Sequence, residues 1–143
     1  MLKIIINHQE KIKEIFKKMQ FLRDNFIPND VFFEELEDLA KNMKEELNFH
    51  FNLQIYSVGE NKKVNYLVKE NLLVRDILFR MLEYIIVKSR EKSLDAFLKF
   101  DDFEEILKAY LKKEKGLFLQ NLSYHLNEEE IKEIEEKLEK LIL

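Results

Sequence analysis

The stretch VNYLVKENLLVRDILFRMLEYI, residues 64–85, decides the fold class. Its apolar residues recur at alternating steps of three and four, which is the spacing of one stripe along an α-helix. Asn71 is the single polar residue in a stripe that otherwise consists of Val64, Leu67, Val74, Leu78, Met81 and Ile85. A helix this long and amphipathic must bury its stripe, and helical neighbours provide the simplest partner.

Three further segments carry the same helical spacing, at about residues 2–24, 31–56 and 101–125. Pro28 and Gly59 lie in the breaks between the first three helices. Asp101 and Glu104 have the spacing of a capping box, which predicts that the fourth helix begins there. We therefore expect an all-α protein, an antiparallel up-down four-helix bundle with a C-terminal helical extension, forming a single domain over residues 1–143.

Composition excludes several other classes of protein. The 143 residues include only 2 Gly and 1 Pro, too few for the turns of an all-β chain, and no Cys for disulfides or thiolate chemistry. The net charge is −4, and 20 of the 24 cationic residues are Lys, which argues against a nucleic-acid partner. No apolar run has the length of a membrane span or a signal peptide, so we expect a cytoplasmic protein that does not bind membranes. No phosphate-binding Gly-rich loop or Ser-His-acid pattern occurs, so we expect no enzymatic turnover.

The C-terminal segment leaves two interpretations open. Asn127 precedes three consecutive Glu residues and is a good N-cap for a new helix, but an unbroken continuation of the fourth helix is equally compatible with the pattern. In both cases a final apolar seam is expected, made of Ile131, Ile134, Leu138 and Leu141. One function compatible with this seam is that of a metal-free helical interaction or scaffold protein, which uses it to dock a partner or to form a homodimer.

All three histidines occupy positions on the apolar seams: His8, His50 and His125. Gln54 follows His50 by one helical turn, and Glu129 follows His125 by four residues. In an antiparallel arrangement these positions, together with Asn71, lie at the same end of the helices. Unpaired buried polar groups cost about 1–3 kcal/mol each, so a shared polar layer is expected.

The order of these residues resembles the hemerythrin-like, or HHE cation-binding, domain over about residues 6–138. The matching motifs are His8, His50-Phe-Asn-Leu-Gln54, Glu70-Asn71-Leu-Leu-Val-Arg75 and His125-Leu-Asn-Glu-Glu129. The resemblance implies a four-helix bundle that holds a non-haem di-iron centre and that binds dioxygen or nitric oxide, or senses or stores iron.

The chain departs from that family at two ligand positions. Gln54 stands where the family has a carboxylate, and Asn71 stands where it often has a histidine. The resemblance therefore implies four metal ligands, His8, His50, His125 and Glu129, with Gln54 and Asn71 as weaker neutral donors.

Charge limits the number of metal ions that this ligand set accepts. Two ferrous ions with one carboxylate would leave a charge of about +3 in an apolar core, which costs several kcal/mol per ion. A complete di-iron site would need Glu46, Glu70 or Glu128 to turn inward. Two interpretations stay open: a single ion, for which iron is implied and zinc fits equally well, or no metal, with Gln54 and Asn71 hydrogen-bonded to the histidines in a network that fixes helix register.

Overall fold

The computed structural model describes residues 2–143, which form helices and short connections and contain no β-strand. The elements in chain order are α1 (Lys3–Asp24), α2 (Asp30–Ile55), a 3-10 turn η1 (Val58–Glu60), α3 (Asn65–Arg90), α4 (Asp95–Lys113), a π-helical segment η2 (Glu114–Phe118), α5 (Leu119–His125) and α6 (Glu128–Ile142). The prediction of an all-α fold is confirmed. No helix in this part of the chain combines the length and apolarity needed to cross a lipid bilayer.

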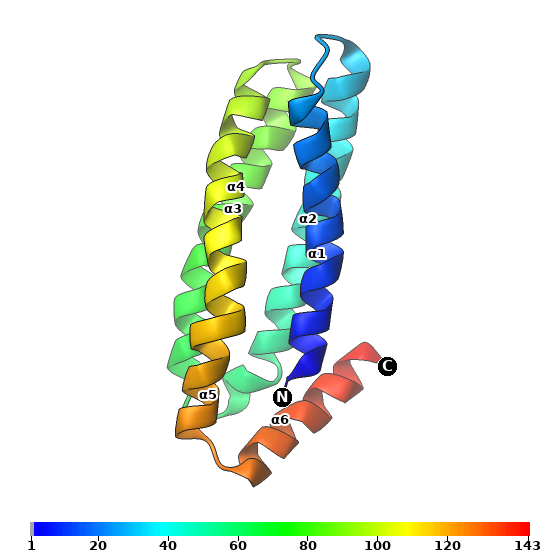
Figure 1. Ribbon diagram of the computed structural model, residues 1–143. Coiled ribbons are helices and arrows are strands. Elements are labelled where there is room, and N and C mark those ends of the chain that lie inside the picture. The colour runs from blue at the N-terminus through cyan, green and yellow to red at the C-terminus, as the bar shows by residue number, and fades with distance from the viewer. Residues whose placement is uncertain (1) are drawn as a thin grey trace.

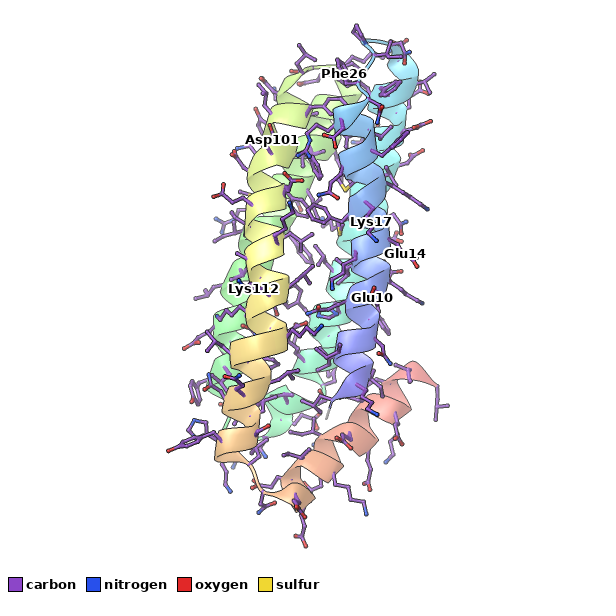
Figure 2. The ribbon with its side chains drawn as sticks, in the orientation of Figure 1. Glu10, Glu14, Lys17, Phe26, Asp101 and Lys112 are labelled. Atoms are coloured by element: carbon purple, nitrogen blue, oxygen red, sulfur yellow. The ribbon has the colours of Figure 1, made fainter. Side chains whose placement is uncertain are left out.

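Helices α1, α2, α3 and α4 run side by side along one long axis, and consecutive helices point in opposite directions (Figure 1). The tightest packing joins neighbours in the chain, α1 with α2, α2 with α3 and α3 with α4. Helix α5 continues the line of α4, and α6 crosses the end of the molecule at which α1 begins (Figure 1). Charged residues such as Glu10, Glu14 and Lys112 are exposed on the outer faces (Figure 2).

The apolar interior consists of two clusters. The larger fills the length between α1, α2, α3 and α4 and contains buried aromatic side chains such as Phe51, Phe100 and Phe103. The smaller lies where α6 covers the end of the other helices, and it includes Ile5 and Leu138. Buried polar side chains lie at the boundary between the two clusters: His8 and Gln9 on α1, His50 and Gln54 on α2, Asn71 on α3 and Glu114 at the start of η2. These polar residues form the candidate site described below.

Helix α4 begins six residues before the predicted capping box. Asp101 and Glu104 lie inside the helix, and both carboxylates accept hydrogen bonds from Arg23 of α1, at 3.0 and 2.8 Å. The capping-box prediction was wrong because an acidic pair at this spacing also suits an interhelical ion pair. The Arg23 guanidinium holds the pKa of Glu104 below its ordinary value.

Asn127 does break the helix, which decides between the two interpretations of the C-terminal segment. Its side chain accepts a hydrogen bond from the Glu130 backbone at 2.8 Å, and the Glu130 carboxylate accepts one from the Asn127 backbone at 3.2 Å, so a capping box starts α6. On the seam of α6, Ile134 and Leu138 are buried in the smaller cluster of this same chain, whereas Leu141 is exposed.

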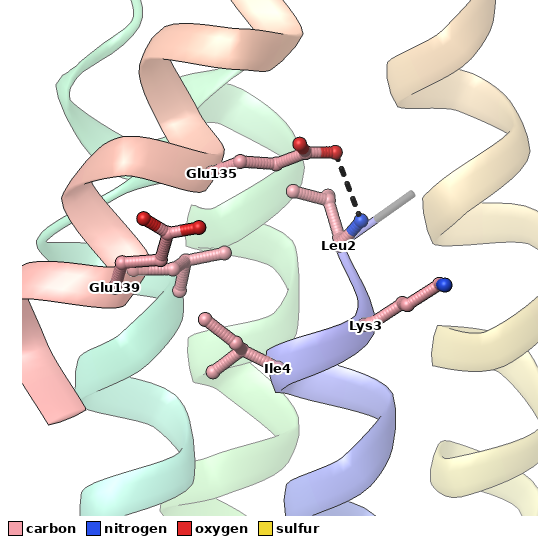
Figure 3. A pocket seen from close by; sticks show the side chains of 6 residues that line it. Leu2, Lys3, Ile4, Glu135 and Glu139 are labelled. Carbon is pink, nitrogen blue, oxygen red and sulfur yellow. Dashed lines mark hydrogen bonds between the residues drawn. The ribbon is translucent and has the colours of Figure 1, made fainter.

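The start of α1 lies against α6. The Leu2 backbone N–H donates to Glu135 Oε1 at 3.4 Å, beside a pocket of about 340 Å³ (Figure 3). The pocket is lined by Leu2, Lys3, Ile4, Glu135, Leu138 and Glu139. Helix α6 thus packs onto the first turn of α1 through both apolar and polar contacts.

Replacing Asn127 with alanine is expected to lower the free energy of unfolding by about 0.5–2 kcal/mol, because the first turn of α6 loses its cap. Equilibrium urea denaturation measures the effect. Asn127→Ser keeps a side-chain acceptor at the same position and should retain most of the stability. An alanine variant as stable as the parent protein would show that the cap does not contribute to the docking of α6.

Candidate functional site

A layer of polar side chains, all of them buried except the half-buried Glu46, crosses the molecule between the two apolar clusters. It joins residues from α1, α2, α3 and the α4–η2 junction: His8, Gln9, Glu46, His50, Gln54, Asn71, Tyr110 and Glu114. We call this set the polar layer. His50, Gln54 and Glu114 have no exposed surface at all. Such side chains are tolerated only when partners satisfy them, and each one has a partner within the layer.

The two histidines of the layer contact each other through their Nδ1 atoms. His8 Nδ1 lies 2.9 Å from His50 Nδ1, and the rings are stacked with centroids 5.1 Å apart. The opposite nitrogen of each ring is bound by a carboxylate. His8 Nε2 lies 2.8 Å from Glu46 Oε2, and His50 Nε2 lies 2.7 and 2.8 Å from the two oxygens of Glu114.

This arrangement fixes how many protons the two rings carry. Ionised carboxylates only accept hydrogen bonds, so the Nε2 atoms of His8 and His50 must both be protonated. A third proton is then needed between the two Nδ1 atoms, which gives the pair of rings a charge of +1. Burial lowers the pKa of His8, and the nearby positive His50 lowers it further, against the opposing hydrogen bond to Glu46. With a charge of +1 on the two rings and −1 on each of the two carboxylates, the layer as a whole carries one net negative charge.

Glu114 is the centre of the layer. Its carboxylate accepts hydrogen bonds from Gln9 at 2.8 Å, from Tyr110 at 2.9 Å, from Gln54 and from His50. Burial alone would raise the pKa of Glu114, but the charge of His50 and these hydrogen bonds hold it below its ordinary value. The residue is consequently ionised in the core at neutral pH.

Gln54 and Asn71 belong to the layer, as predicted, but their partners differ from the expected ones. Asn71 Nδ2 donates to Gln54 Oε1 at 3.0 Å, and Gln54 Nε2 donates to the Tyr110 hydroxyl at 2.8 Å and to Glu114. Neither amide is hydrogen-bonded to a histidine. Burial and the adjacent Glu114 charge raise the pKa of Tyr110 well above its ordinary value, so its hydroxyl stays protonated and donates.

The structure does not bring His125 or Glu129 into the layer. His125 is exposed at the last position of α5, where its Nε2 lies 3.4 Å from the Tyr66 hydroxyl. Glu129 is exposed in the first turn of α6, beyond the break at Asn127. The prediction that His125 and Glu129 belong to the layer assumes an uninterrupted α-helix. The π-helical segment η2 adds a residue to one turn and so shifts the helical period that follows it; beyond η2, Leu122 and Leu126 are buried and His125 is exposed.

Sequence reasoning missed Glu114, Tyr110 and Gln9. Glu114 did carry a signal, since it lies three residues after Leu111 and four before Phe118, on the same apolar seam. Tyr110 lies one turn before Glu114, which is the spacing of two side chains on one helical face. A glutamate on a seam is the same kind of anomaly as the histidines. Gln9 adjoins His8 and carried no signal of its own.

An open pocket of about 380 Å³ reaches His8 from outside the molecule. It is lined by Ile4, Asn7, His8, Lys11, Phe49, Leu53, Leu141 and Ile142. Glu46, the carboxylate partner of His8, is also partly exposed. The polar layer is thus buried around Glu114 and approaches solvent at the His8 side.

The polar layer contains two imidazole rings and two carboxylates as possible metal ligands. In the part of the chain that the structure describes, no three His, Asp or Glu side chains are arranged around a common point as a metal cluster. The Nδ1 atoms of His8 and His50 lie 2.9 Å apart. Two neighbouring ligands that are each about 2.0–2.1 Å from one ion are separated by a similar distance, roughly 3 Å. The two carboxylates would balance one divalent ion, whereas two ions would leave about +2 in the core.

No family model, curated protein or solved structure matches this chain. The hemerythrin-like resemblance remains a prediction from short motifs, two of which, around His8 and His50, contribute histidines to the polar layer. The functional conclusion accordingly depends on the chemistry of that layer.

Acidification of the chelator-treated protein is expected to destabilise it in two steps. The native pKa values of His8 and Glu114 both lie below the ordinary values of 6.5 and 4.5, so the unfolded chain binds more protons as the pH falls. The contribution of His8 is present above about pH 6.5 and is lost as the pH falls below it; that of Glu114 is lost below about 4.5. Urea denaturation at a series of pH values measures this profile. A free energy of unfolding that stays constant from neutral pH to pH 4 would contradict it.

Proposed function

We propose that this protein is a hemerythrin-like metal-binding protein that holds a single divalent transition-metal ion between Nδ1 of His8 and Nδ1 of His50. The fold that we infer for it is an antiparallel up-down four-helix bundle, with α6 as the C-terminal extension. The observation that carries the proposal is the convergence of two Nδ1 atoms at 2.9 Å, each on a ring whose other nitrogen is bound to a carboxylate.

This pattern of contacts is typical of histidines that bind metals. A metal-binding imidazole commonly donates its second N–H to a carboxylate, which fixes the tautomer and orients the ring. Glu46 has this role toward His8, and Glu114 has it toward His50. The chain therefore supplies oriented ligands on two helices, with the carboxylates behind them.

Charge balance supports one ion. With the shared proton, the layer carries a net charge of −1. If a divalent cation replaces that proton, its charge cancels the charges of the Glu46 and Glu114 carboxylates, and the net charge is zero. Zero net charge is the preferred state of a buried site. A di-iron centre is not part of the proposal, because His125 and Glu129 lie outside the layer.

Iron is the metal that the family resemblance implies, and zinc suits the same donors. When bound, an ion with few protein ligands supplies open positions for a small ligand such as dioxygen or nitric oxide. The pocket beside His8 gives such a ligand a path to the site. Sensing or storage fits this arrangement better than turnover, since every acid and base in the layer is held in a closed set of hydrogen bonds.

The test is the metal content of protein expressed with added iron, purified without oxygen and dialysed. We expect close to one ion per chain for the parent protein and for His125→Ala, which removes the one histidine outside the layer. His8→Ala and His50→Ala should each retain less than about a tenth of an equivalent, because removing a ligand from a site this small abolishes affinity. Circular dichroism confirms that the variants are folded.

Two results would overturn the proposal. One is a parent protein that retains no transition metal under these conditions. The other is a metal content that His50→Ala leaves unchanged, which would place the ion elsewhere on the chain.

A metal-free interaction protein is the second candidate function, and the completeness of the hydrogen bonding favours it. Ser89 Oγ is the one buried side-chain polar atom within residues 2–143 that lacks a partner, so the polar layer is satisfied without a ligand. In this case the layer fixes the register of the helices, as buried polar residues do in coiled coils. The seam of α6 is a poor docking surface, since Ile134 and Leu138 are covered by this chain.

A further inference from the structure

Helix α3 presents a second apolar stripe, on the side opposite to its buried one. The stripe follows steps of four and three along the whole helix: Tyr66, Glu70, Leu73, Ile77, Arg80, Tyr84 and Val87. We call these seven residues the outer seam. The same alternation defines the contact stripe between two helices in a coiled coil.

The outer seam is exposed although five of its seven members are apolar. The exposed fractions are 67% for Leu73, 48% for Val87, 45% for Tyr66, 44% for Ile77 and 39% for Tyr84. Large apolar side chains in a continuous exposed row are typical of interaction surfaces. From Tyr66 to Tyr84 the row is about 27 Å long, at the rise of an α-helix.

The two charged members of the outer seam have no partner among the residues that the structure describes. Glu70 and Arg80 are exposed, and neither forms an ion pair or a side-chain hydrogen bond anywhere in residues 2–143. Their neighbours on α3 behave differently: Arg75 pairs with Asp76 at 2.9 Å, and Glu83 pairs with Lys44 at 2.8 Å. An acid and a base at these two places on one apolar stripe are complementary to a surface that offers the opposite charges in the same order.

A second copy of this chain offers that surface. When two copies of α3 lie antiparallel about a twofold axis near position 75, Glu70 faces Arg80 of the other copy. The same register sets Leu73 opposite Ile77 and Tyr66 opposite Tyr84. We propose that the protein forms a homodimer through the antiparallel association of two outer seams. Each contact then occurs twice, as twofold symmetry requires.

Charge selects the antiparallel orientation. In a parallel pairing in register, Glu70 would meet Glu70 and Arg80 would meet Arg80, and like charges at such positions destabilise the association. In the antiparallel pairing both charged contacts are attractive. The proposal does not depend on metal binding, because the outer seam and the polar layer are on different faces of α3.

Sedimentation equilibrium over a wide range of concentrations, together with charge-reversal variants, tests the dimer. Glu70→Arg and Arg80→Glu should each raise the dissociation constant by about tenfold or more, since each converts two attractive contacts into two repulsive ones. The double variant, E70R with R80E, restores opposite charges across the axis and should return the constant to within about threefold of the parent value. This rescue is expected only for the antiparallel pairing.

Matched variants control for general effects of charge and hydrophobicity. Glu105→Arg reverses an exposed acid on α4 and should leave association unchanged. Leu73→Lys should abolish the dimer, whereas Phe21→Lys, at an exposed apolar residue of α1, should not. A protein that stays monomeric at every concentration would refute the proposal, and so would a dimer that is insensitive to the charge reversals or is not rescued by the double variant.

Discussion

Replacing Glu114 with alanine is expected to lower the free energy of unfolding by about 3–5 kcal/mol, because removing one partner of a buried ion pair leaves the other uncompensated. His50 would lose the carboxylate that now lies 2.7 Å from its Nε2. Gln9 and Tyr110 would each lose an acceptor as well. A loss of this size is a large part of the roughly 5–15 kcal/mol that typically stabilises a domain.

Urea denaturation at neutral pH measures this loss, with two variants for comparison. Glu114→Gln keeps the shape and part of the hydrogen bonding but removes the charge, so it should cost less than the alanine variant. Glu105→Gln changes an exposed acid of α4 and should lie within about 0.5 kcal/mol of the parent protein. If Glu114→Ala cost less than about 1 kcal/mol, the layer would not be the tightly coupled network described here.

Binding of metal is expected to stabilise the chelator-treated protein by about 2.7 kcal/mol when free ferrous ion is at roughly 100 times its dissociation constant. For a domain of this size that corresponds to a rise in melting temperature of roughly 5–10 °C. The physical reason is mass action: the native state presents His8 and His50 together, and the unfolded chain does not. Anaerobic differential scanning calorimetry measures the shift.

The controls for this shift are variants at the three histidines. His50→Ala and His8→Ala should show no metal-dependent rise, while His125→Ala should show the full one. Magnesium, which prefers oxygen ligands, should have little effect on any of them. An equal rise in all variants would mean that the metal acts through the many surface carboxylates instead of the polar layer.

The sequence was sufficient to place most helices, because the helical period and the breaks at Pro28 and Gly59 are set by residues that are close together in the sequence. The helices expected at about residues 2–24 and 31–56 match α1 and α2 to within about one residue, and the stretch at residues 64–85 lies almost entirely within α3. The start of α4 was misplaced, since the Asp101 and Glu104 pair has two physical uses and only the fold shows that Arg23 lies beside it.

About half of the residues of the candidate site could be predicted from the sequence. The residues of α4 and η2 could not. His8, His50, Gln54 and Asn71 were found as polar interruptions of apolar stripes, and they do share one layer. The fourth helix was expected to contribute His125, because its position was predicted with a constant α-helical period. The π-helical turn at η2 breaks that period, and nothing in its sequence except Gly116 indicates the change.

The same turn has a structural consequence for the layer. Glu114 is its first residue and lies between the two apolar clusters, where it faces both glutamines and His50. Segments of π-helix often occur at functional sites because they re-aim side chains within an otherwise regular helix. Here Glu114, at the start of the π-helical turn, supplies a negative charge that balances the histidine pair.

The most direct measurement is an anomalous difference map from crystals of the protein loaded anaerobically with ferrous iron. We predict one peak per chain, between the Nδ1 atoms of His8 and His50. Two peaks in the polar layer, a peak at another place, or none at full loading would contradict a single-ion site.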